Sequence, residues 1–419
     1  MNEWKEVKLD EIGDVFSGGT PSTTNTELWD GNIAFVTPFD LSRNKTPYIK
    51  KTQRYISRKG LEQSSTNLLP ANSLILSSRA PIGYIALSDI EFVTNQGCKS
   101  LKFFDTQEPL FHYYNLQMYV DEMKRYGVGT TFSEISKGDL SKLKIRIPKN
   151  NKDQLHIAKI LFTCDTVIEQ TQSAIAKYKA IKQGLLHGLF TRGLDGNGKL
   201  RPRYQEAPEL YKESELGMIP KEWEVNRLEE CTNYVDYRGK TPPKSDIGIV
   251  LVTAKNIRFG YIDYELSKEY IYEYAFESAM SRGKAFIGDV LITTEAPMGN
   301  VAQINKEGIA LAQRVIKYQG YKDKLNNDFL KLALMSDLFQ KTLLSEATGS
   351  TALGIKGSRL HKLKILIPQI EEQREIAKRV KTIDNKIQSE ETLLQKYQSI
   401  KRGLMGDLLG GKKMMLHDE

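Results

Sequence analysis

The chain has 419 residues, more than one growing hydrophobic core accommodates, so two or more domains are expected. Lys and Arg outnumber Asp and Glu by 60 to 52, and the net charge of +8 favours a polyanionic partner. The three cysteines lie outside any metal-binding spacing, which argues against a metal-dependent protein. No signal sequence and no apolar run of membrane-spanning length is found, so a cytoplasmic protein is predicted rather than a secreted or membrane protein.

Residues 1–150 are predicted to form a strand-rich domain. Short apolar runs such as 33–36 and 73–76 lie between clusters of Gly, Pro, Asn and Ser. A helical pattern over 110–126 interrupts these runs. We therefore expect an α+β fold for this domain.

A long helix is predicted to follow over residues 151–192. Its apolar positions are spaced by four and three residues in near alternation, which is typical of a coiled coil. The alternative is that the helix packs only on its own domain. The predicted contact positions, called the seam below, are Ile157, Leu161, Ile168, Ile175, Tyr178, Ile181 and Leu185.

The rest of the chain is predicted to repeat this organisation after a Gly-, Pro- and charge-rich connector at 193–222. A second domain is expected over 223–369, with a helical pattern at 329–344, and a second long helix over 370–411. The matching length and register of the two helices predict that they pair with each other. The second half of the seam is Ile376, Val380, Ile383, Ile387, Leu394, Tyr397, Ile400 and Leu404.

The two halves are related by an internal repeat of about 219 residues. Trp4 returns as Trp223, and the segment 80–83 (Ala-Pro-Ile-Gly) returns as 296–299 (Ala-Pro-Met-Gly). Apolar residues, Gly and Pro recur in order, whereas the polar stretches between them differ almost completely. This pattern predicts two domains with a common scaffold and different surfaces.

No catalytic or metal-binding motif is found. The segment 238–241 (Arg-Gly-Lys-Thr) ends like a phosphate-binding loop, but Tyr234 occupies the position of the first required Gly and Pro242 follows where a helix would begin. The five histidines are scattered and none lies at metal-ligand spacing from another ligand. We therefore predict no catalytic residue and no metal site in this chain.

Essentially the whole chain resembles the specificity (S) subunit of type I restriction-modification systems, most clearly in the run 216–223 (Leu-Gly-Met-Ile-Pro-Lys-Glu-Trp). Three features support the resemblance: the paired Ala-Pro-x-Gly segments, Gly-Thr-Thr at 129–131 against Gly-Ser-Thr at 349–351, and the two Ile-Lys-x-Gly-Leu helix ends. It implies two target-recognition domains, held apart by antiparallel helices, that bind the two halves of a split, asymmetric site on double-stranded DNA. It also implies two modification subunits that use S-adenosylmethionine, and restriction subunits that use ATP and Mg²⁺. Methyl transfer and cleavage would belong to those partners.

DNA contacts are expected in loops beside the repeated landmarks, because base edges are recognised by hydrogen bonds and phosphates by cations. Arg79 and Arg314 are candidates for bidentate pairing with guanine. A solvated surface charge is the alternative for every basic residue. The predicted contacts are Thr20, Arg43, Lys45, Arg79, Lys99, Arg125, Thr130 and Thr131 in the first domain, and Lys240, Lys244, Lys255, Arg258, Arg314, Ser350 and Thr351 in the second.

Two other functional classes remain open at this point. A coiled-coil adaptor could use the duplicated domains to hold protein partners, and the modest net charge would suit it. A nuclease with an unrecognised active site is the other alternative. Salt-sensitive DNA binding would separate a DNA-recognition protein from an adaptor, and product formation by the isolated chain would reveal an enzyme.

Overall fold

The computed structural model describes residues 4–127, 134–237, 242–349 and 353–411. The chain forms two compact units. Unit 1 comprises Met1–Ala174 with Glu390–Glu419, and unit 2 comprises Ile175–Ser389. Each unit contains one of the repeated domains and a part of both long helices.

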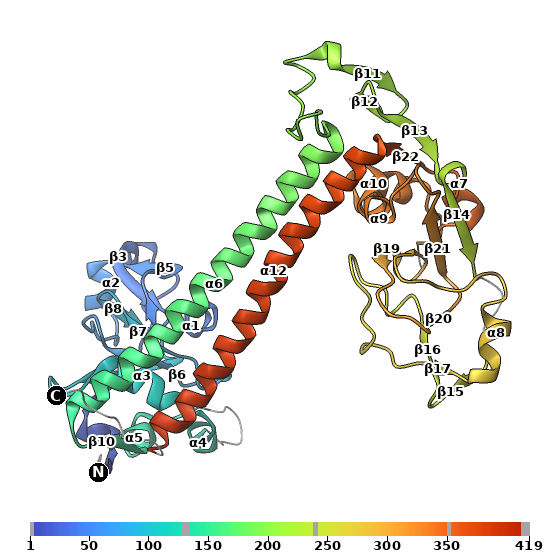
Figure 1. The fold of residues 1–419 in the computed structure, drawn as a ribbon. Helices are drawn as coiled ribbons and strands as arrows, with labels where there is room; N and C mark the ends of the chain where they lie inside the picture. The colour runs from blue at the N-terminus through green and yellow to red at the C-terminus, as the bar shows by residue number, and fades with distance from the viewer. Residues whose placement is uncertain (1–3, 128–133, 238–241, 350–352, 412–419) are drawn as a thin grey trace, which may run out of the picture. The chain divides into compact units, whose positions relative to one another are not determined.

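Unit 1 is built on two mixed sheets, in which antiparallel pairs predominate (Figure 1). Strands β1 (Trp4–Lys8) and β10 (Lys144–Pro148) form a separate antiparallel pair that joins the two ends of the domain. The five-stranded sheet has the order β2 (Gly13–Ser17), β9 (Cys98–Phe103), β6 (Leu74–Ser77), β7 (Ile85–Ser88), β4 (Tyr48–Ile49), and the three-stranded sheet has the order β5 (Arg54–Ile56), β3 (Trp29–Val36), β8 (Phe92–Thr94).

The helical stretch at 110–126 packs against one face of the larger sheet. The predicted helical stretch at 110–126 is two helices, α3 (Pro109–Gln117) and α4 (Val120–Tyr126). Phe111 and Tyr114 of α3 are fully buried in a core that also contains Ile157 and Leu161. The remaining short helices are α1 (Pro38–Arg43), α2 (Arg58–Glu62) and α5 (Lys137–Ser141).

Unit 2 repeats this plan, which confirms the duplicated α+β fold. The pairing of Ile292 with Ile316 in its main sheet corresponds to the pairing of Leu76 with Lys99 in unit 1. One four-stranded sheet has the order β14 (Thr232–Asp236), β21 (Val315–Gly320), β18 (Val290–Thr294), β19 (Met298–Gln303). The other has the order β15 (Lys244–Ser245), β17 (Tyr270–Ile271), β16 (Ile249–Val252), β20 (Ala310–Leu311). Two strand pairs complete the unit: β13 (Glu224–Arg227) with β22 (Lys364–Ile367), and β11 (Tyr211–Ser214) with β12 (Gly217–Pro220). Its helices are α7 (Leu228–Cys231), α8 (Phe276–Ala279), α9 (Asn327–Met335), α10 (Asp337–Ser345) and α11 (Gly357–Leu360).

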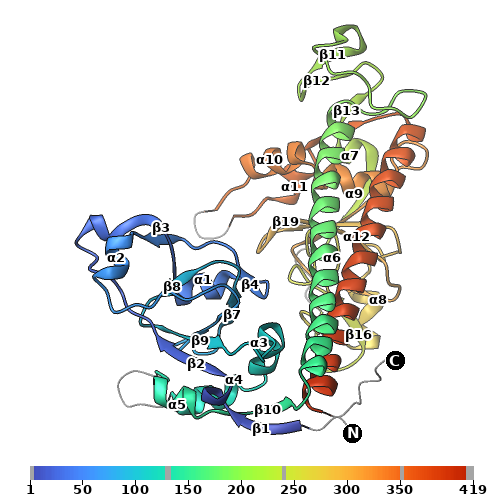
Figure 2. The same cartoon turned by 90° about the vertical axis from the view of Figure 1, so that its left-hand side faces the viewer.

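The long helices α6 (Asn151–Thr191) and α12 (Ile370–Leu404) lie side by side in both views (Figures 1 and 2). In unit 1, Lys401 forms an ion pair with Asp165, and Ile157 shares a core with Leu404. In unit 2, the Nζ of Lys182 lies 2.5 Å from Oδ1 of Asp384. Residue numbers rise along α6 as they fall along α12, so the helices are antiparallel.

The seam residues are buried or half-buried except Ile181 and Ile400, which are 45% and 43% exposed. These repeat-equivalent residues are a correction to the predicted seam. Their next neighbours, Lys182 and Lys401, face the partner helix instead and form the interhelical ion pairs. Successive residues of an α-helix point about 100° apart, so the isoleucines turn away. The buried seam residues are Ile157, Leu161, Ile175, Ile376, Val380 and Ile387, and Ile168, Tyr178, Leu185, Ile383, Leu394, Tyr397 and Leu404 are half-buried.

Among the helices of the described ranges, none combines the length and the apolar composition that a membrane crossing requires.

Candidate nucleic-acid interface

Of the predicted contact residues of unit 1 that the structure describes, all are exposed except one. Thr20 lies in a loop, where its hydroxyl donates a hydrogen bond to the Gln96 side-chain oxygen. Arg43, at the end of α1, stacks on Phe39 with its guanidinium carbon 4.5 Å from the ring centroid, and Lys45 follows it. Arg125 is exposed on α4, whereas Thr130 and Thr131 lie outside the described residues.

The exception is Lys99, whose side chain is only 6% exposed. It points into unit 1, where its Nζ lies 3.0 Å from Oε1 of Glu134 and 3.4 Å from the hydroxyl oxygen of Ser78. The expectation that Lys99 contacts DNA is therefore wrong for this conformation. The ammonium group has its counter-charge inside the protein and presents no donor at the surface.

Glu134 links Lys99 to Arg79. Its second carboxylate oxygen lies 2.9 Å from the Nε of Arg79, and the Arg79 side chain is 47% exposed. Burial raises the pKa of Glu134, but the hydrogen bonds from Lys99 and Arg79 outweigh it and hold this pKa below its ordinary value. Glu134 could not be found from the sequence, because 35 and 55 positions separate it from its partners and no spacing pattern marks it.

In unit 2, two of the predicted contact residues lie beside a carboxylate and two are exposed in a loop. The Nζ of Lys244 lies 2.5 Å from Oε2 of Glu269, and this ion pair, opposed by burial, lowers the pKa of Glu269. Lys255 and Arg258 are exposed in the loop after β16. Arg314 has a φ of +71° and its Nε lies 3.6 Å from Oε2 of Glu295. Lys240, Ser350 and Thr351 lie outside the described residues.

The loops at these positions share a backbone arrangement but differ in their side chains. The amide of Ile135 donates to the Ser78 carbonyl at 2.9 Å, and the amide of Ile355 donates to the Thr294 carbonyl at 3.0 Å. The residue that follows Ser78 is Arg79, and the residue that follows Thr294 is Glu295. At equivalent backbone positions, unit 1 thus carries a cationic side chain, Arg79, and unit 2 carries an anionic one, Glu295.

Unit 2 also exposes aromatic side chains that the sequence analysis did not single out. Tyr274 is 79% exposed and stacks on Tyr272 with ring centroids 5.2 Å apart. Tyr261 and Phe286 are exposed nearby in the chain. Exposed aromatic residues suit contacts with bases or with a protein partner. The density of tyrosines between 261 and 274 was the available signal.

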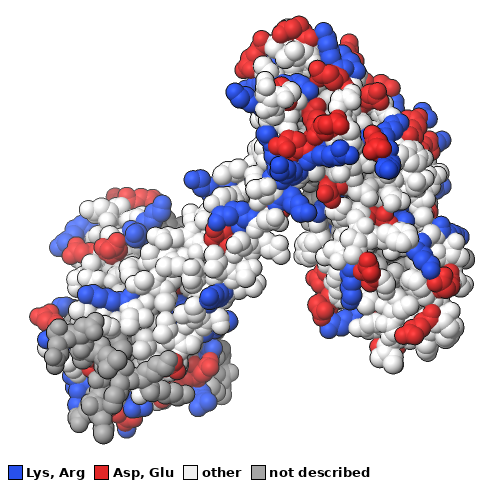
Figure 3. Space-filling model, viewed as in Figure 1, with Lys and Arg blue, Asp and Glu red and all other residues white. Residues whose placement is uncertain are grey.

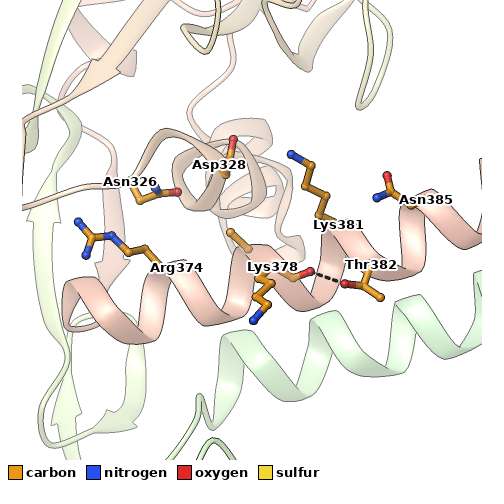
Figure 4. A pocket seen from close by; sticks show the side chains of 8 residues that line it. Asn326, Asp328, Arg374, Lys378, Lys381, Thr382 and Asn385 are labelled. Atoms are coloured by element: carbon orange, nitrogen blue, oxygen red, sulfur yellow. Dashed lines mark hydrogen bonds between the residues drawn. The ribbon is translucent and has the colours of Figure 1, made fainter.

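Charges of both signs are interspersed over much of the face shown in Figure 3, and Lys and Arg gather along the helical segment of unit 2. There, a cavity of about 280 Å³ lies between α12 and the start of α9 (Figure 4). Arg374, Lys378 and Lys381 line it and form no ion pair within the described residues, while Asp328 is the single acidic lining residue. The cavity can therefore accept an anionic group.

The described part of the chain contains no cluster of three or more His, Cys, Asp or Glu side chains placed to hold a metal ion.

A family model for the type I restriction modification DNA specificity domain matches the chain twice, over residues 1–178 and 220–398. The MjaIX specificity subunit of Methanocaldococcus jannaschii is 32% identical over 228 residues, which cover 54% of this chain and about half, 51%, of that protein. The MjaVIII specificity subunit of the same organism is 25% identical over 426 residues, covering 98% of this chain and 93% of that protein.

The structural likeness spans nearly the whole chain. The crystal structure of a type I restriction-modification S subunit from M. genitalium superposes with a TM-score of 0.59 at 18% identity, covering 99% of this chain and 97% of that one. At this identity, the likeness shows the fold alone. A chain from a structure describing complex assembly of the type I R-M system gives a TM-score of 0.51 at 15% identity, covering 97% of each chain.

Proposed function

The chain belongs to the family of type I restriction modification DNA specificity proteins, and we propose that it recognises a split, asymmetric site on double-stranded DNA, one half through each unit. The observation that best supports this proposal is the pair Arg79 and Glu295 on equivalent backbone. A guanidinium group donates hydrogen bonds and pairs with guanine, whereas a carboxylate accepts them and pairs with cytosine. Two domains with oppositely charged side chains at the equivalent position would select different bases, and the two halves of the target would therefore differ.

We further propose that this chain acts without catalysis of its own, as the DNA-recognition member of a larger complex. Two modification subunits and ATP-dependent restriction subunits would bind to it. S-adenosylmethionine, ATP and Mg²⁺ would bind to those partners. The two specificity domains matched within one chain support this division of labour.

The direct test is co-expression of this chain with its modification subunit in a methylation-free host, followed by mapping of methylated adenines. We expect a motif of two different short sequences separated by unspecified bases. A continuous or palindromic motif would contradict two-domain recognition. No motif, with the methyltransferase shown to be active, would favour the adaptor alternative.

Binding of duplex DNA by the complex provides a second test. We expect the logarithm of the binding constant to fall linearly with the logarithm of the salt concentration, because cations on the recognition domains displace counterions from phosphates. The isolated chain, incubated with DNA and all cofactors, should give neither methylated nor cleaved product. Either product would place catalysis in this chain.

A further inference from the structure

The burial of Lys99 carries a considerable desolvation penalty, which suggests that the side chain has a function. Its side chain is 6% exposed, and its hydrogen-bond partners are Glu134 and Ser78. Desolvating an ammonium group costs several kcal/mol, and replacing a buried ion pair by apolar residues is often neutral or stabilising. Stability alone therefore does not account for a lysine at this position.

The geometry around Glu134 fixes the direction of Arg79. One carboxylate oxygen faces Lys99 at 3.0 Å and the other faces the Nε of Arg79 at 2.9 Å. This bond uses Nε and leaves the Nη1 and Nη2 atoms of a 47% exposed side chain for a ligand. With two cations and one anion, the triad of Lys99, Glu134 and Arg79 keeps a net positive charge.

Unit 2 lacks the whole triad although its backbone is the same. Its residues at these three positions are Ile316, Gly354 and Glu295, as the matching strand registers and loop bridges show. All three members are replaced together. This joint replacement is what a set of residues with one shared task would undergo.

We propose that Lys99 is a positioning residue that, through Glu134, orients Arg79 for bidentate pairing with a guanine in the half-site bound by unit 1. This inference rests on the proposed function. Arg79 touches the base, whereas Lys99 acts only through the Glu134 carboxylate.

A base contact explains the triad better than a phosphate contact. Phosphate contacts position a protein on the duplex but carry no sequence information, and a point charge such as an exposed lysine can supply them. The O6 and N7 atoms of guanine accept two parallel hydrogen bonds from a guanidinium group, and this pairing requires a defined orientation. A guanidinium held by a carboxylate with its own buried counter-ion meets that requirement.

The test uses the complete complex of this chain with its modification subunits. Wild type and the variants Arg79→Gln, Glu134→Gln and Lys99→Met are compared by methylation mapping and by competition between duplexes that differ at one base pair. We expect Arg79→Gln to reduce discrimination about 10- to 100-fold at a single guanine of one half-site. Glu134→Gln and Lys99→Met should relax that same position by several-fold, with the other half-site unchanged.

Lys317→Met in unit 2 is the matched control. Lys317 is a buried lysine with a carboxylate partner, Asp289, at 2.9 Å, and it forms no ion pair with an exposed arginine within the described residues. This variant loses the same kind of buried charge and should leave discrimination at the Arg79-dependent guanine unchanged. Glu134 is 30% exposed, so Glu134→Gln tests the same link if Lys99→Met does not fold.

Three results would overturn the inference: an equal loss of affinity for all duplexes in Arg79→Gln, relaxation at a base pair without guanine, or full discrimination in both Lys99→Met and Glu134→Gln. The first would make Arg79 a phosphate contact, and the last would make Lys99 purely structural. Failure of the proposed function is distinguishable, because the wild-type complex itself would then give no split motif.

Discussion

Arg201 in the connector and Glu372 in the first turn of α12 form a buried ion pair, with Nη1 lying 2.8 Å from Oε1 across 171 positions of sequence. The same carboxylate accepts hydrogen bonds from the indole nitrogen of Trp223 at 3.2 Å and from the amide of Leu194 at 2.7 Å. One side chain of α12 thus fixes three points of the segment that enters the second domain.

Replacing Glu372 by Gln should therefore destabilise unit 2. We expect the free energy of unfolding to fall by about 3 kcal/mol, because Arg201 stays buried without its main counter-charge. Urea unfolding followed by tryptophan fluorescence measures this, since Trp223 lies in the network. Glu62→Gln, which breaks the exposed pair with Arg58, is the control and should cost less than about 1 kcal/mol. Equal effects of the two variants would contradict the prediction.

His112 should make unit 1 sensitive to acid. It is fully buried, and burial lowers its pKa from 6.5 to about 3. Below pH 6.5 the unfolded chain binds a proton at this histidine that the folded chain does not bind. The contribution of neutral His112 to the free energy of unfolding is therefore fully present above pH 6.5 and is lost as the pH falls towards 3. The slope should be about 1.4 kcal/mol per pH unit.

Urea unfolding of wild type and His112→Gln at several pH values between 7.5 and 4.5 tests this slope. The difference between the two proteins should shrink as the pH falls, because only wild type loses stability through His112. His187→Gln, at an exposed histidine of α6, is the matched control and should run parallel to wild type. Parallel curves for His112→Gln would refute the assignment.

The main sheets of the two units also differ at a second buried pair of positions. Unit 2 has Asp289 and Lys317, an ion pair of 2.9 Å, where unit 1 has Ser73 and Ser100, whose buried hydroxyl groups have no hydrogen-bond partner among the described residues. We expect Lys317→Met to cost about 3–5 kcal/mol, because it leaves the Asp289 carboxylate buried and uncompensated.

Ser100→Ala should change the free energy of unfolding by less than about 1 kcal/mol, because the hydroxyl group that it removes makes no hydrogen bond within the described part of the chain. Thermal unfolding of the two variants beside wild type checks both expectations. A large loss in Ser100→Ala, or none in Lys317→Met, would show that these side chains have other roles.

The long helices should tolerate a charged side chain at Ile181, which faces away from the partner helix, but not at Val380, which is buried. Val380 is buried, so Val380→Asp places a carboxylate in an apolar core and should cost more than about 3 kcal/mol. Ile181→Asp, at a 45% exposed position, should cost less than about 1 kcal/mol in the isolated chain. Circular dichroism during thermal unfolding compares them, and a similar loss in both would restore Ile181 to the seam.

The residue-level predictions were less complete than the predictions of the fold. The repeat and the α+β class could be predicted because apolar residues, Gly and Pro recur in fixed order. Glu134 could not, because loop residues have no periodicity that links them to partners in distant strands. Lys99 is predicted to contact DNA because it is basic and lies beside a repeated landmark, and this prediction is wrong because its counter-ion comes from another segment.

The duplication, the two long helices and their approximate register could be predicted from the sequence, because they follow from spacings along a local stretch of chain. The tertiary structure alone decided which cations meet solvent and which meet a carboxylate. It placed Lys99 inside and Arg79 outside, and it turned Lys182 rather than Ile181 towards α12. The physical reason is that the direction of a side chain and the identity of its counter-ion depend on segments brought together only by folding.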